Sequence, residues 1–564
     1  MIKNSAFIFL ILYLFSSELT AQNLFLKITG SSDDETTLIS EFDYNTKHKD
    51  YNSILIEVNA FQKKIIKAGY IENDYSVLRK INDSLFLAKF QLGNKYDKIE
   101  IRYDSTKISK SIIDLVCKDS NSNYFTIPFT EIEETLVRIN NEVSNDGFPF
   151  SKIKLSEIKI KDNKTLQSKL ILIINDKRRS LDNIVVKGYE KFPKSYLNRF
   201  LKIKPEAIFN ISTIKNKMNA LNNLRFAEQI KAPEVLFTKD STVLYIYLKK
   251  LQSNTFDGFL GFSTNEETNK IDFNGYINLE LNNNLNYGES FNLIYKSDES
   301  EQKNFDVNLT LPYLFSSPIG TEIALNILKR DSTFTSINQK ASVFYQLNAK
   351  NKFFLGVESI ESNNLLEDDF NFEIADYNSI NYNLKYTFEN RNNFYSLFRI
   401  KSRIWFEFGL GNRKTVDKRE SQKRILLDAL HTFQLNSKNS FYTRVNGAII
   451  QSKNYFENEL FRFGGINSIR GFQENSIIAN KYIVLNTEYR YQLSQSIYAH
   501  SIIDFGNFDN KISEINENLY GFGLGFGIST KAGLLKFNFA NGKSEKQNFK
   551  FSNSKIHLSL VSIF

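Results

Sequence analysis

Apolar residues in the first 250 positions recur at helical spacing in two segments. Four of them stand at i, i+4, i+7 and i+11 within Ile54–Ile65, and Gly69-Tyr70 follows. The same spacing returns within Ile132–Val143, followed by Gly147-Phe148. This spacing places apolar side chains on one stripe of a helix, and a glycine just beyond the stripe is a common helix end. The second segment therefore repeats the first at a constant offset in residue number (148 − 70 = 143 − 65).

A third and weaker copy of the pattern has Ile214, Leu221 and Phe226, at the same offset again (226 − 148 = 148 − 70). Strand-like runs surround each predicted helix, so each copy is predicted to be a small α+β module. We assign residues 22–104, 105–180 and 181–250 to the three modules. The predicted strands, in chain order, are Leu24–Thr29, Leu85–Leu92 and Lys98–Tyr103, then Ser151–Ile158 and Lys169–Ile174, then Asn183–Lys187, Val235–Thr238 and Thr242–Lys249.

After Lys250 the helical spacing stops, and alternating apolar and polar segments of about ten residues begin, separated by Asn, Asp, Ser and Gly turns. In Tyr520–Ile528 glycines alternate with Phe522, Leu524 and Phe526. One face of that strand suits lipid and the other a filled interior. We count about sixteen such segments, which predicts a transmembrane barrel of antiparallel strands over residues 251–564.

The composition agrees with a membrane barrel, because 50 Phe and 28 Tyr stand against one Trp, and such barrels carry aromatic girdles. The net charge of +9 is spread along the chain, so no nucleic-acid partner is expected. The single cysteine, Cys117, cannot form an intramolecular disulfide and is predicted to be a packed thiol. Because the four histidines are scattered and show no ligand spacing, we expect no metal and no cofactor.

The N-terminal segment, residues 1–21, has the pattern of an export signal. Lys3 precedes an apolar run from Ala6 to Phe15, and Leu19-Thr20-Ala21 offers a cleavage site. The apolar run is about half of the ~20 residues that a spanning helix needs. The signal predicts that residues 1–21 direct the chain out of the cytoplasm.

Residues 463–472 read Phe-Gly-Gly-Ile-Asn-Ser-Ile-Arg-Gly-Phe. This motif resembles the sixth-loop signature of the family that contains the barrel-assembly proteins BamA and TamA and the two-partner secretion transporters. The resemblance rests on the loop residues together with Glu488 and Asp504, which follow Arg470 in the next two strand-like segments at spacings similar to the family's. The N-terminal modules resemble the family's POTRA domains, with Ile184–Gly188 as an opening strand. The loop residues that carry the motif are Gly464, Gly465, Ser468, Arg470, Gly471 and Phe472.

Alternation along the strand Tyr482–Tyr491 puts Glu488 on the face opposite Tyr489, and therefore toward the interior. A loop folded inward could lodge Arg470 against Glu488 and Asp504, because a guanidinium pairs with carboxylates in a forked geometry. Gly471 would allow a tight turn. The resemblance further implies a barrel seam between the first strand, near Phe256, and the last, near Ile563, with Phe564 as a C-terminal targeting residue.

The resemblance implies POTRA domains in the periplasm and a barrel in the outer membrane that assembles or translocates proteins. The expected partners are unfolded outer-membrane or secreted protein clients, the lipid bilayer and an inner-membrane protein similar to TamB. Three modules favour a TamA-like protein, since BamA usually carries five. The alternatives are a two-partner-type transporter for a dedicated exported protein and a passive pore or receptor. Because the sequence contains no set of residues with catalytic spacing, we do not expect an enzyme.

Overall fold

The protein is described by a computed structural model. The predicted signal, residues 1–21, and Phe564 lie outside the described residues. The chain divides into two compact units: residues 1–180 with 208–211, and residues 181–207 with 212–564. The structure describes residues 23–117, 119–174, 177–264, 271–297, 302–366, 373–392, 397–530, 533–545, 549–550 and 554–563.

The first module has a sheet in the order β2-β1-β5-β3, with β4 also pairing with β5. Its helix α3 (Tyr51–Lys67) begins at a capping box formed by Asp50 and Ser53, and it buries its four predicted apolar residues. Strand β1 runs parallel to β5. The remaining elements are α2 (Asp33–Ile39), β1 (Leu24–Gly30), β2 (Lys47–His48), β3 (Asp74–Tyr75), β4 (Arg79–Lys80) and β5 (Leu85–Gln91).

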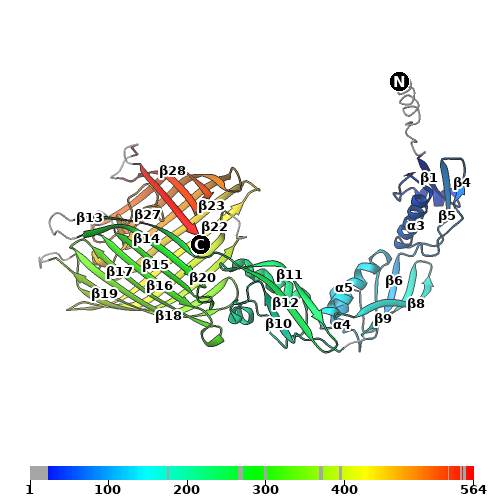
Figure 1. Ribbon diagram of the computed structural model, residues 1–564, viewed down its shortest axis with the longest axis horizontal. Coiled ribbons are helices and arrows are strands. Elements are labelled where there is room, and N and C mark those ends of the chain that lie inside the picture. Colours follow the sequence, from blue (N-terminus) through cyan, green and yellow to red (C-terminus); the bar gives the residue numbers. More distant parts are fainter. Residues whose placement is uncertain are drawn as a thin grey trace, which may run out of the picture. The chain divides into compact units, whose positions relative to one another are not determined.

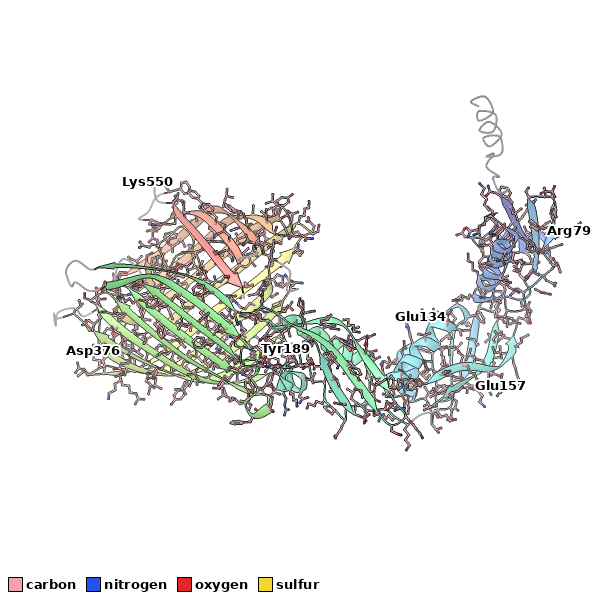
Figure 2. The ribbon with its side chains drawn as sticks, viewed as in Figure 1. Arg79, Glu134, Glu157, Tyr189, Asp376 and Lys550 are labelled. Atoms are coloured by element: carbon pink, nitrogen blue, oxygen red, sulfur yellow. The ribbon has the colours of Figure 1, made fainter. Side chains whose placement is uncertain are left out.

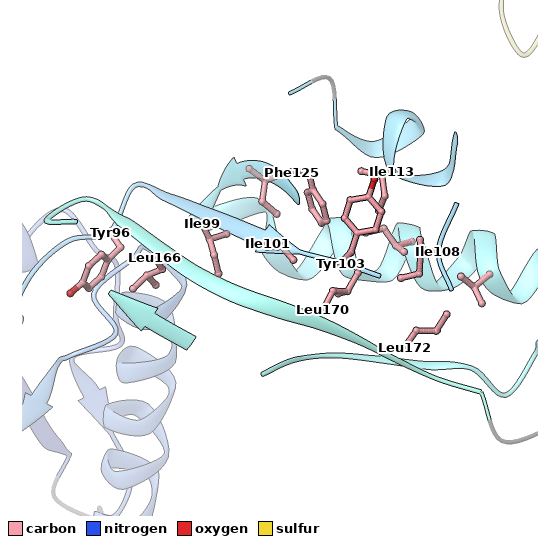
Figure 3. Packing of buried hydrophobic residues seen from close by; sticks show 13 residues of the cluster. Tyr96, Ile99, Ile101, Tyr103, Ile108, Ile113, Phe125, Leu166, Leu170 and Leu172 are labelled. Carbon is pink, nitrogen blue, oxygen red and sulfur yellow. The ribbon is translucent and has the colours of Figure 1, made fainter. Parts of the chain in front are cut away.

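The second module has a four-stranded sheet in the order β7-β6-β9-β8. Phe125, Tyr103 and Ile113 lie in the apolar core between this sheet and the helices (Figure 3). The predicted strand Lys98–Tyr103 is β6 of this sheet, so its assignment to the first module was wrong. The elements are β6 (Lys98–Arg102), α4 (Lys110–Val116), β7 (Tyr124–Pro128), α5 (Ile132–Asn145), β8 (Lys152–Asp162) and β9 (Thr165–Ile173).

Parallel pairing explains this correction. Strand β6 pairs with β9, which follows it only after two helices and two further strands, from Lys98 opposite Thr165 to Arg102 opposite Lys169. Alternation predicts that a segment is a strand, but it carries no information about which distant strand is the partner. The boundary between the first two modules therefore lies before Lys98 rather than at residue 104.

The third module has the sheet β10-β12-β11. As in the other two modules, the opening strand is parallel to a central strand, which is antiparallel to its other neighbour. Ile214, Leu221 and Phe226, which were predicted from the repeat, are buried in it. Its elements are β10 (Asn183–Lys187), the π-helix η2 (Tyr196–Phe200), α6 (Ile211–Met218), the 3-10 helix η3 (Asn219–Asn223), β11 (Ala227–Phe237) and β12 (Thr242–Lys250).

The barrel is closed, and its sixteen strands are all antiparallel, which confirms the predicted number (Figure 1). The strands are β13 (Thr255–Thr264), β14 (Ile271–Asn282), β15 (Ser290–Ser297), β16 (Lys303–Leu311), β17 (Ile319–Arg330), β18 (Phe334–Gln346), β19 (Asn351–Asn364), β20 (Tyr377–Arg391), β21 (Ile400–Lys414), β22 (Arg419–Gln434), β23 (Asn439–Gln451), β26 (Lys481–Gln492), β27 (Ile497–Asn510), β28 (Ile515–Thr530), β29 (Gly533–Lys543) and β30 (Lys555–Ile563).

The barrel wall is apolar outside and polar inside. On β28, Phe522, Leu524 and Phe526 are exposed on the outer face, whereas charged side chains such as Glu407 and Arg413 are buried on inward-facing positions. This inversion relative to a soluble protein is typical of a barrel surrounded by lipid. Among the described residues, no helix is both long and apolar enough to cross a membrane.

The third module packs against turns at one end of the barrel, where Tyr189 marks the junction (Figure 2). The hydroxyl of Tyr189 accepts a hydrogen bond from Asn283 Nδ2 at 2.7 Å and donates one to Asn286 Oδ1 at 2.9 Å. Tyr196 donates to the carbonyl of Gly288 at 3.1 Å. The long loops of the barrel, including the one that carries the Arg470 motif, lie at the opposite strand ends.

Candidate functional site

The loop between β23 and β26 contains a short hairpin, β24 (Phe461–Phe463) with β25 (Ile477–Ala479). Phe463 stacks on Tyr482 of β26, with ring centroids 4.3 Å apart and planes 7° apart. Ile469 and Phe472 join the same buried cluster with residues of β26, β27 and β28. This apolar cluster holds the loop against inward-facing positions of the wall, and so the loop lies within the barrel.

Arg470 is 5% exposed and binds two carboxylates. Its Nε and Nη2 donate to Oδ2 and Oδ1 of Asp504 at 2.8 and 2.5 Å, and its backbone N–H donates to Oδ2 at 2.9 Å. Its Nη1 donates to Glu488 Oε1. The forked geometry that Arg supplies is used on Asp504. The structure therefore brings together the three charged residues that the sequence analysis singled out.

Neighbouring side chains complete this arrangement. Arg490 donates to the second oxygen of Glu488 at 2.7 Å, and its guanidinium lies 4.0 Å from the centre of the Tyr442 ring. Asn486 Nδ2 donates to the carbonyl of Ser468 at 2.7 Å. Arg444 Nη1 donates to the carbonyl of Asn467 at 2.7 Å. The roles of Arg444 and Arg490 were not predicted, although alternation along Tyr482–Tyr491 places Arg490 on the same face as Glu488.

Two glycines make room for the loop. Gly471 has φ +92°, and a Cβ there would lie 2.4 Å from the backbone of Asn541. On β28, a Cβ at Gly521 would lie 2.3 Å from the carbonyl oxygen of Arg470. The glycine face of β28 thus leaves room inside the barrel for the backbone of the loop. Gly464 and Gly465 also have positive φ values, of 117° and 89°.

The remaining motif residues have packing roles. Phe472 is 7% exposed in the apolar cluster. Ser468 closes a turn through its backbone N–H, which donates to the carbonyl of Gly465 at 3.1 Å. Its hydroxyl is buried and has no hydrogen-bond partner among the described residues.

The seam between the first and last strands is short. Strand β13 pairs with β30 at two positions in the described residues, Thr255 opposite Ile563 and Phe256 opposite Ser562. On its other side, β13 pairs with β14 over ten positions. The two predicted seam residues, Phe256 and Ile563, are therefore both at the seam but are not opposite each other.

A sequence model of the Omp85 superfamily domain matches residues 274–556, half of the chain, including the whole loop between β23 and β26. The chain belongs to the Omp85 superfamily. A POTRA model, described as a surface antigen variable number repeat, matches residues 180–250, the third module. An Omp85 barrel with POTRA modules lies in the outer membrane, with the modules in the periplasm. The long loops at the end away from the third module are therefore extracellular.

Two solved CdiB structures share the fold of this Omp85 protein at low sequence identity. CdiB from Escherichia coli aligns with a TM-score of 0.52 at 14% identity, covering 89% of this chain and 96% of CdiB. CdiB from Acinetobacter baumannii aligns with a TM-score of 0.50 at 17% identity, covering 82% and 89%. BamA from Haemophilus ducreyi lacking POTRA domains 1–3 aligns with a TM-score of 0.48 at 16% identity, covering 82% and 99%. No protein of curated function matches the sequence.

Proposed function

We propose that this Omp85 protein assembles or translocates proteins at the bacterial outer membrane, in the manner of a TamA-like barrel. A client strand adds to the edge of a POTRA sheet, the barrel parts between β13 and β30, and client strands pair with the exposed edge before leaving sideways into the bilayer. The observation that carries the proposal is the two-position seam between β13 and β30.

The energetics favour opening at this seam. Each backbone group left unpaired in lipid costs several kcal/mol, so a long ladder resists separation. The ladder between β17 and β18 has twelve pairs, whereas the seam has two in the described residues. A client strand that pairs with β13 would satisfy backbone groups that β30 leaves unpaired. The folding of the client therefore supplies the driving force, and no nucleotide is needed.

The POTRA sheets offer edges for the first contact. Strand β8 is the outer strand of the second module, and Ile158 and Ile160 on it are more than half exposed. An extended apolar peptide can add to such an edge through main-chain hydrogen bonds. An inner-membrane partner similar to TamB belongs to the same proposal and would be recovered by crosslinking from the first module.

Depletion of the protein in its host, followed by quantification of the outer-membrane proteome, tests the proposal. We expect several barrel proteins to be lost together and to return on re-expression of the wild-type chain. The loss of one secreted protein alone would favour a dedicated two-partner-type transporter. An unchanged proteome would contradict both and favour a passive pore or receptor.

A further inference from the structure

The loop that carries Arg470 is also bound to a second part of the barrel wall, through the turn Phe456–Glu459. This turn precedes the hairpin β24–β25 and contains three consecutive polar residues, Glu457, Asn458 and Glu459. Asn458 and Glu459 are 7% and 4% exposed. Arg470 with its partners Glu488 and Asp504, here called the Arg470 clamp, ties the loop to strands β26 and β27. The turn instead contacts β17, β19, β21 and β22.

Glu459 has both carboxylate oxygens satisfied. Arg413 Nη1 on β21 donates to Oε1 at 2.5 Å, and Gln422 Nε2 on β22 donates to Oε2 at 2.8 Å. The side chains of Arg413 and Glu459 are 2% and 1% exposed, so the pair is buried. The guanidinium of Arg413 also lies 4.3 Å from the centre of the Phe456 ring.

Asn458 and Glu457 bind residues farther along the wall, on β19 and β17. Asn458 Nδ2 donates to Ser362 Oγ on β19 and to the carbonyl of Ala375, both at 2.8 Å. Glu457 accepts from Arg330 at the end of β17 and from Arg462 at 3.3 Å. The strand residues Arg330, Ser362, Arg413 and Gln422 lie at the extracellular ends of their strands, whereas Glu488 and Asp504 lie near the middle of theirs.

We infer that Glu457, Asn458 and Glu459 form a second anchor of the loop, which closes the extracellular mouth of the barrel independently of the Arg470 clamp. Burial of charged groups is costly compared with apolar packing. Arg413 also pairs with Glu420 on β22, so the charge that positioning of the loop explains is that of Glu459. With both anchors formed, the loop crosses the lumen between two arcs of the wall. The three residues are positioning residues, because their contacts are with the wall and with the loop itself.

Ion conductance of the full-length protein in planar phosphatidylcholine bilayers with potassium chloride measures whether the mouth is closed. We expect the open fraction to rise for Glu459→Gln and for Asn458→Ala. In an Arg470→Ala background, where the other anchor is lost, we expect each change to raise it further, on the order of tenfold or more. Glu361→Gln, on the exposed face of β19 beside Ser362, is the matched control and should behave like the wild type. Heat-modifiable migration on gels establishes that each barrel is folded.

A crosslink provides a test that does not depend on weakening the fold. Cysteines at Asn458 and Ser362, in a Cys117→Ser and Arg470→Ala background, should restore low conductance when joined by a short thiol crosslinker, and reduction of a cleavable linker should release it. The inference would be overturned if the Glu459 and Asn458 variants conducted like their parent proteins in both backgrounds. It would also be overturned if the crosslink had no effect. No client is present in these measurements, so they stand apart from the proteome experiment.

Discussion

Arg470 binds Asp504 and Glu488 inside the barrel, where each charge is shielded from water. The Asp504 and Glu488 side chains are 0% and 10% exposed, and that of Arg470 is 6% exposed. Removal of one partner from a buried ion pair costs about 3–5 kcal/mol, because the remaining charge stays desolvated. If Arg470 is removed, movement of the loop out of the barrel would let water reach the two carboxylates and would lower this cost. Arg470 therefore fixes the position of the loop.

Arg470→Ala is expected to leave a folded barrel with a released loop and weakened client assembly. Arg470→Lys should not restore function, because an ammonium cannot reproduce the fork on Asp504. Client levels in the outer membrane and heat-modifiable migration are the measurements. Arg419→Ala on the exposed part of β22 is the control. Full activity of Arg470→Ala would refute the role proposed for the clamp.

Gly521→Ala should have the same effect as loss of Arg470, although it removes no charge. The new Cβ would lie 2.3 Å from the carbonyl oxygen of Arg470, a backbone atom that cannot move without the loop. Gly525→Ala on the same strand is the control, because its Cβ would meet side-chain atoms of Asn538 and His500 rather than the backbone of the loop. Protease accessibility of the loop on intact cells distinguishes the two variants. Equal protection in both would contradict this account.

At the scale of the element, the barrel strands differ mainly in how far each is paired. Strand β30 pairs with β29 over seven positions and with β13 over two in the described residues. Main-chain pairing is the dominant cohesion between strands in lipid, because no water is available to replace it. Opening of the wall, which we propose as part of the mechanism, would therefore cost least at the seam.

A disulfide across the seam should block client assembly. Cysteines at Phe256 and Ser562, which lie opposite each other, are introduced in a Cys117→Ser background. Oxidation is expected to reduce the yield of inserted clients several-fold, and reduction should restore it. The matched control is a disulfide between Ile323 and Ala341, opposite positions on β17 and β18. Unchanged insertion with the seam locked would rule out lateral opening as the mechanism.

At the scale of the whole molecule, the third module and the barrel form one compact unit. Tyr196 is central to their contact, since its ring packs edge-on against Tyr313 at 5.0 Å and burial raises its pKa. Arg199 Nε donates to the carbonyl of Ser316 at 2.8 Å. These contacts combine aromatic packing with hydrogen bonds to turns of the barrel. The third module is therefore packed against the barrel and is not joined to it by the chain alone.

Tyr196→Ala should loosen the third module without unfolding the barrel. Loss of a buried aromatic side chain costs about 3–5 kcal/mol, and its hydrogen bond to Gly288 is lost with it. Limited proteolysis in detergent should then cut between the third module and β13, whereas Lys249→Ala on the exposed end of β12 should be as resistant as the wild type. Equal resistance of the two variants would show that other contacts fix the module.

Much of this architecture follows from local sequence patterns. Helical spacing locates α3 and α5, because a helix stripe depends only on residues within a few turns. Alternation predicted nearly all barrel strands, since facing is set residue by residue. Strand β15 shows where the pattern is weak, because Leu293, Ile294 and Tyr295 are consecutive and break the alternation. The Arg470 motif was readable because its residues and spacing are all present in the chain.

Pairing between distant segments was decided only by the tertiary structure. Lys98–Arg102 joins the second module because it pairs with β9. The seam is short because β13 and β30 pair at only two positions in the described residues. The second anchor at Glu459 was not predicted, since its partners Arg413 and Gln422 lie on strands far from it in the sequence. Local patterns determine what each segment becomes and which way its side chains face. Which segments meet is determined by the tertiary structure, because the edge of each strand pairs with another strand that can lie far away in the sequence.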